Sequence, residues 1–164
     1  MVVTVLAAVV ATSALAASAP TRTSFAAGSW SGSARLSQTI EGFAFTAKST
    51  FTMQIRNGRA SGTVVSRGSG SGRIQGQTLR MAMTGGLPLA GRPGAPSARG
   101  NLKFTATIGG QSQSGVLPAV ATLTKLRGTC DRMTGKLSYK LADATQLLTA
   151  PFTATRARGG AACS

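Results

Sequence analysis

The feature that most constrains the fold of this chain is a strict alternation of apolar and polar residues over long stretches. Between residues 43 and 56 the odd positions are mainly apolar, and the even positions are mainly Thr, Lys, Gln or Arg. Successive side chains of a β-strand point to opposite faces, so a period of two predicts a strand with one buried face and one solvated face. The apolar positions of this stretch are Phe43, Phe45, Ala47, Phe51, Met53 and Ile55.

The same alternation recurs along the chain and predicts further strands. It is clearest around residues 30–40, 102–108 and 136–141, and no segment shows a convincing helical period of 3.6 residues. Asn57-Gly58 is the strongest hairpin signal, with a following strand predicted over residues 59–66. Additional strands are predicted at residues 73–75 and 79–83 (one bulged strand or two short ones), 116–127 and 152–157. Seven to nine short strands predict an all-β domain, either an antiparallel β-barrel or a β-sandwich.

Three stretches are predicted to lie outside the strands. Residues 67–72, Arg-Gly-Ser-Gly-Ser-Gly, have the composition of a flexible connection. Residues 85–100 contain three prolines and are predicted to form a long loop. Residues 142–148 are predicted to form a single helical turn or a loop.

The first residues have the pattern of an export signal. Residues 2–16 carry no charge and are too short for a membrane span of about 20 residues. Ala14-Leu15-Ala16 supplies the small-x-small pattern of a cleavage site, although no Lys or Arg precedes the apolar run. A buried first strand is the alternative. The predicted organisation is a cleaved signal peptide at 1–16, a flexible segment at 17–27 and one domain at 28–164, in a protein that is secreted or held in the periplasm or cell envelope.

The two cysteines, Cys130 and Cys163, are predicted to form a disulfide, because an even count in an exported chain favours pairing. Closing this loop would contribute about 3–4 kcal/mol in the chain-entropy model. The alternative is a reactive thiol at Cys130, which has Arg132 nearby but no histidine anywhere in the chain to activate it.

The scarcity of acids and the absence of histidine disfavour catalysis. The chain has no His and only three carboxylate side chains, Glu41, Asp131 and Asp143, scattered along the sequence. General acid–base catalysis and glycoside hydrolysis rely on His or on paired carboxylates, and metal sites need clustered His, Cys, Asp or Glu. We therefore expect a noncatalytic protein without a metal or another cofactor.

The 18 Lys and Arg residues give a net charge of +15, which favours polyanionic partners. Seven of them have the parity opposite to the apolar residues of their strands and predict a positive outer face: Arg35, Lys48, Arg56, Arg80, Lys103, Lys136 and Lys140. The aromatic residues follow the inward parity, so the base-stacking surface typical of nucleic-acid binding is not expected. The leading hypothesis is an exported domain that binds an anionic polymer or an anionic membrane surface. The alternatives are a β-barrel carrier of a small apolar ligand, an enzyme with a Lys-based or substrate-assisted mechanism, and a basic composition without a binding role.

Overall fold

The computed structural model describes residues 25–40, 42–142 and 147–157, and these form eight β-strands and no helix. The strands contain between 9 and 18 residues, so the prediction of short strands was wrong. In chain order they are β1 (Gly28–Ile40), β2 (Phe43–Arg56), β3 (Arg59–Ile74), β4 (Gln77–Gly91), β5 (Ser97–Ile108), β6 (Gln111–Gly128), β7 (Arg132–Leu141) and β8 (Leu148–Arg156).

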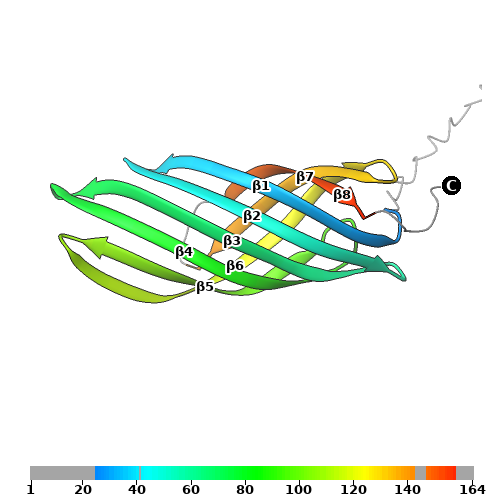
Figure 1. The fold of residues 1–164 in the computed structure, drawn as a ribbon, viewed down its shortest axis with the longest axis horizontal. Helices are drawn as coiled ribbons and strands as arrows, with labels where there is room; N and C mark the ends of the chain where they lie inside the picture. Colours follow the sequence, from blue (N-terminus) through cyan, green and yellow to red (C-terminus); the bar gives the residue numbers. More distant parts are fainter. Residues whose placement is uncertain (1–24, 41, 143–146, 158–164) are drawn as a thin grey trace, which may run out of the picture.

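The strands close into a single antiparallel barrel (Figure 1). Each strand pairs with the next along the chain, and β8 pairs with β1, where Gly32 lies opposite Ala154. The predicted all-β class is confirmed, and of the two architectures the barrel is correct and the sandwich is not. The interior follows the predicted parity, with Phe51, Met53 and Ile55 all buried.

Tight turns set the register of the long hairpins. Asn57 and Gly58 form the predicted β2–β3 turn with φ of 49° and 69°, the left-handed region that favours Asn and Gly. Gln75 and Gly76 join β3 to β4 with φ of 50° and 79°. Residues 73–74 therefore end β3, Gln75 lies in the turn, and residues 79–83 lie in β4, so the prediction of one bulged strand or two short ones was wrong.

The prediction of a flexible connection at residues 67–72 was wrong, because this stretch continues β3. Its glycines occupy the inward-facing positions, and aromatic rings from β2 fill the space above them. A Cβ at Gly68 would lie 2.7 Å from Cζ of Phe45, and the ring of Phe43 covers Gly70 in the same way. Glycine is therefore required here by the packing of phenylalanine, not by chain flexibility.

The long loop predicted for residues 85–100 was also wrong. β4 extends to Gly91 and β5 begins at Ser97, so only residues 92–96 connect them. Pro88 is tolerated within β4 because the direct pairing with β5 is interrupted there, between Thr84 and Leu89. A proline without an N–H can occupy a strand position where no partner needs that donor.

The two ends of the barrel differ. Three hairpins, β1–β2, β3–β4 and β5–β6, project past the shorter strands β7 and β8 at one end (Figure 1). The register agrees with this picture, because β1 pairs with β8 only as far as Ala34, and β6 pairs with β7 only from Ala119. We call this the hairpin end, and the end with the β2–β3 and β4–β5 connections the opposite end.

A continuous hydrophobic core fills the middle of the barrel, with Trp30 only 1% exposed. Of the predicted flexible segment 17–27, the structure describes residues 25–27. Phe25 and Ala26 pack against the core, and Nε1 of Trp30 donates a hydrogen bond to the Ala26 carbonyl at 3.1 Å. The predicted signal peptide at 1–16 lies outside the described residues.

Candidate functional site

All seven predicted basic residues are exposed on the barrel wall. The register determines which of them are neighbours. Arg35 on β1 lies directly opposite Lys48 on β2, and Lys48 lies directly opposite Arg67 on β3. We call Arg35, Lys48 and Arg67 the basic row. Neighbouring strands are about 4.8 Å apart, so three cations originate within about 10 Å of one another.

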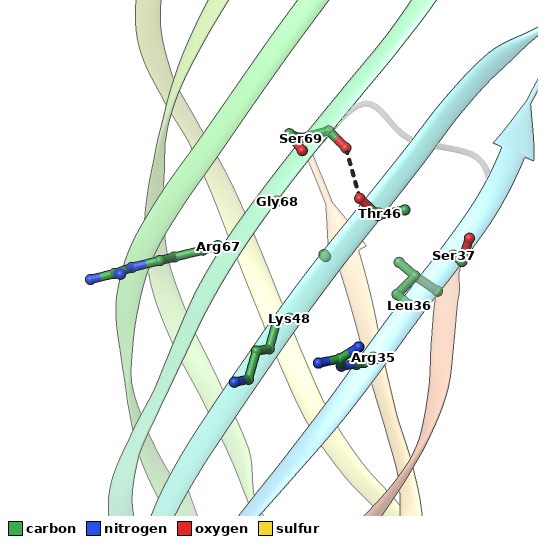
Figure 2. A pocket seen from close by; sticks show the side chains of 9 residues that line it. Arg35, Leu36, Ser37, Thr46, Lys48, Arg67, Gly68 and Ser69 are labelled. Carbon is green, nitrogen blue, oxygen red and sulfur yellow. Dashed lines mark hydrogen bonds between the residues drawn. The ribbon is translucent and has the colours of Figure 1, made fainter.

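The basic row borders a depression of about 560 Å³ in the barrel wall (Figure 2). Its lining comes from three neighbouring strands, at residues 35–37, 46–48 and 67–69. The lining combines outward-facing cations and hydroxyls with three positions of inward parity, Leu36, Ala47 and Gly68. Hydroxyl side chains border the cations: Oγ1 of Thr46 donates a hydrogen bond to the carbonyl of Ser69 at 3.5 Å, and Ser37 lies beside them.

Repulsion among the cations of the basic row is unfavourable in the protein without a bound anion. Like charges directly opposite each other on neighbouring strands are destabilising. No carboxylate lines the depression, and Asp131, the one acidic side chain in the part of the chain that the structure describes, lies in the β6–β7 connection. Glu41 and Asp143 are outside the described residues. An anion at this position would relieve a repulsion that the described side chains leave uncompensated.

The remaining predicted cations are more dispersed. Arg56 lies opposite Arg59, and both line a second depression of about 620 Å³ together with Arg92. The other four have uncharged residues directly opposite them in the register: Arg80, Lys103, Lys136 and Lys140. The structure therefore brings together Arg35 and Lys48 among the seven and leaves the others apart.

Sequence reasoning missed Arg67, because the glycine-rich stretch around it was interpreted as a connection. The signal that identifies it is the Asn57-Gly58 turn. Residues equally distant from a two-residue turn pair with each other, and Lys48 lies nine residues before Asn57 as Arg67 lies nine after Gly58. The predicted turn was therefore sufficient to place Arg67 beside Lys48.

Among the described residues, Ser49, Ser66 and Tyr139 form a polar cluster inside the barrel. Ser49 and Ser66 lie opposite each other on β2 and β3, with 3.1 Å between their hydroxyl oxygens. The phenol of Tyr139 reaches across from β7, donates to Ser49 at 2.9 Å and hydrogen-bonds to Ser66. Burial raises the pKa of Tyr139, so the phenol stays protonated at neutral pH and is not available as a base for activating a serine. The cluster satisfies its own hydrogen bonds and links three strands.

The described residues include no group of three or more His, Cys, Asp or Glu side chains that could hold a metal ion. Nor does any helix in that part of the chain have the length and apolar character needed to cross a membrane. Comparison of the chain with family models, with curated proteins and with solved structures finds no match.

Proposed function

We propose that this protein is an exported, noncatalytic β-barrel domain that binds an anionic polymer through its outer wall. The observation that supports this proposal is the basic row, in which Arg35, Lys48 and Arg67 occupy directly neighbouring positions on three strands. Such an arrangement lowers the stability of the free protein, and a bound anion would neutralise the repulsion among the three cations. Neutralisation of charge would carry the affinity, so binding should weaken steeply as salt increases.

The test compares two variants with the same change in net charge. The first removes the basic row (Arg35→Ser, Lys48→Thr, Arg67→Ser). The control removes three dispersed cations (Arg80→Ser, Lys136→Thr, Lys140→Ser). Both are applied to an immobilised acidic polymer at low salt and eluted with a salt gradient. Each cation near an anionic surface contributes about 1 kcal/mol, so losing the row should weaken binding by roughly 100-fold.

The control should lose far less affinity, because its three cations do not act together. Equal losses in the two variants would show that only net charge matters, and would contradict the assignment of a site. Failure of the natural protein to bind at low salt would contradict polymer binding altogether.

Export and the disulfide belong to the same proposal. Cys163 lies outside the described residues, so the Cys130–Cys163 bond remains a prediction. Two contacts support it: the N–H of Arg156 donates to the Asp131 carbonyl at 2.9 Å, and Nη1 of Arg156 lies 3.5 Å from Sγ of Cys130. Cys163 follows only seven residues after Arg156, within about 24 Å of extended chain. The intact mass of the secreted protein, before and after reduction, tests for the bond, and its N-terminal sequence tests for cleavage before Ala17.

A second candidate function, carriage of a small apolar ligand, has its own supporting observation. A depression of about 840 Å³ lies at the opposite end of the barrel, and its apolar lining includes Phe25, Ile55, Pro93 and Leu126. This volume is in the range of small-molecule sites. The buried core occupies the middle of the barrel, so the ligand would bind at this mouth.

An uncharged fluorescent naphthylamine dye tests this candidate without interference from the basic row. Phe25→Ser should abolish saturable binding if the mouth is the site. Val116→Ser, which changes an exposed residue outside this mouth, is the matched control. Binding that is equal in both variants, or absent from the natural protein, would contradict the carrier function.

A further inference from the structure

We propose that the ligand of the basic row is a flexible acidic polysaccharide, and that it runs across the strands from Arg35 on β1 to Lys103 on β5. This inference rests on the proposed polymer binding and adds a direction and a chemical class to it. It follows from the register of the barrel wall, from its curvature and from the side chains beside the row.

The register extends the basic row beyond its three cations. Arg67 lies opposite Thr84 on β4, and Thr84 lies opposite Lys103 on β5. Lys103 is therefore in the same transverse line as Arg35, four interstrand steps away, which corresponds to about 19 Å along the wall. A ligand that leaves Arg67 in this direction meets the next cation after about 10 Å.

The direction along the strands toward the cluster at Arg56 is less favourable. Arg56 is eight residues from Lys48 along β2, a distance of about 26 Å, and no charged residue lies between them. On β3 the corresponding path crosses Val65, which is 41% exposed. An anionic chain would pass over uncharged and partly apolar wall in this direction, so the transverse path is favoured.

The curvature of the wall requires a flexible ligand. Arg35 and Lys103 are separated by four of the eight strand-to-strand steps around the barrel, so one straight rod cannot contact both. Double-stranded DNA has a persistence length of about 50 nm and would touch the convex wall over a short arc only. A flexible polyanion can follow the wall and reach all four cations.

The side chains beside the row favour a ligand with hydroxyl groups. The position two residues along each strand carries Ser37, Thr46 and Ser69, and the position on the other side carries Ser33 on β1 and Thr50 on β2. These hydroxyls can exchange hydrogen bonds with sugar hydroxyls while the cations neutralise carboxylates or sulfates. Every aromatic side chain of the chain is buried or half-buried, so base stacking is not available on this wall.

The experiment measures the affinity of single-cation variants for polygalacturonate fragments of two lengths at low salt. Lys103→Thr should weaken binding of fragments longer than about 20 Å by about fivefold, and should leave fragments of about 10 Å unaffected. Arg56→Thr removes one cation from the other cluster and should leave both lengths unaffected. A flexible polyphosphate without hydroxyls and a short DNA duplex should each bind more weakly than a polysaccharide of equal charge.

The possible results separate the two proposals. Long fragments that bind the natural protein but lose equal affinity in Lys103→Thr and Arg56→Thr overturn the transverse path and leave polymer binding intact. Equal or tighter binding of polyphosphate or duplex overturns the polysaccharide class. Failure of the natural protein to bind any of the polymers overturns both proposals.

Discussion

Replacing Tyr139 by Phe removes one hydroxyl from the polar cluster inside the barrel and leaves the ring in place. That hydroxyl donates to Ser49 at 2.9 Å and hydrogen-bonds to Ser66. A buried hydrogen bond contributes about 0.5–1.5 kcal/mol, so losing two should lower the free energy of unfolding by about 1–3 kcal/mol. Ser49 and Ser66 remain 3.1 Å apart and can still bond to each other, which places the expected loss toward the lower end.

The triple variant Ser49→Ala, Ser66→Ala, Tyr139→Phe provides the sharper test. Each single change leaves buried partners with unmet hydrogen bonds, whereas the triple change removes every polar group of the cluster. Replacing all partners by apolar groups of similar shape is nearly neutral, because no desolvated group is left unpaired. The triple variant should therefore lose clearly less stability than the sum of the three single variants.

Urea denaturation followed by the fluorescence of Trp30 measures these differences, because this single tryptophan is buried in the core. Thr105→Val is the matched control: it removes a hydroxyl that bonds to Ser114 at 2.9 Å on the exposed wall, and its effect should stay within about 0.5 kcal/mol. A triple variant as unstable as the sum of the single variants would refute the reasoning, since the serines and the tyrosine would then act independently.

Burial raises the pKa of Tyr139 above its usual value of about 10, so its contribution to stability is complete below that pH and is lost as pH rises toward the folded-state pKa. Unfolding free energies measured from pH 8 to 11 should fall less in Tyr139→Phe than in the natural protein. A Cβ at Gly62 would overlap the carbonyl of Thr52, whereas a Cβ at Gly86 has its nearest neighbour at 3.9 Å. Gly62→Ala should therefore cost about 2–4 kcal/mol in urea denaturation and Gly86→Ala less than about 0.5 kcal/mol, and equal costs would contradict this packing. Lys48→Glu converts two repulsive cross-strand pairs into attractive ones. It should raise stability by up to about 1 kcal/mol at low salt and reduce retention on an acidic polymer, and unchanged retention would argue against the basic row.

The sequence was sufficient to predict the all-β fold class and most inward-facing residues, because the two-residue period is a local property. Phe51, Met53 and Ile55 are buried as the alternation predicts. The same pattern also places Ser49 inward, but a polar residue at an inward position does not identify its partner. The partner, Tyr139, lies 90 residues away and becomes a neighbour only when the barrel closes.

Glycine and proline misled the prediction for a common physical reason. Their usual association with loops reflects conformational freedom and the missing N–H, but both can be accommodated within strands by tertiary structure. Gly68 makes space for the ring of Phe45, and Pro88 lies in β4 where the direct pairing with β5 is interrupted. Neither the ring nor the interruption of the pairing is visible from the composition of the surrounding segment.

The pairing of the cations in the basic row follows from local hairpin signals in the sequence. Outward parity alone spreads the cations over the whole wall and gives no reason to prefer any of them. Ile40 pairs with Phe43, and Arg35 and Lys48 pair because each lies five residues from that pair. The Asn57-Gly58 turn then pairs Lys48 with Arg67. Two turns therefore convert a dispersed charge into three adjacent cations. Lys103 is different: the connection between β4 and β5 is longer and its pairing is interrupted, so only the folded barrel places Lys103 in line with the row. The transverse ligand path consequently depends on tertiary structure, whereas the basic row itself depends on two hairpins.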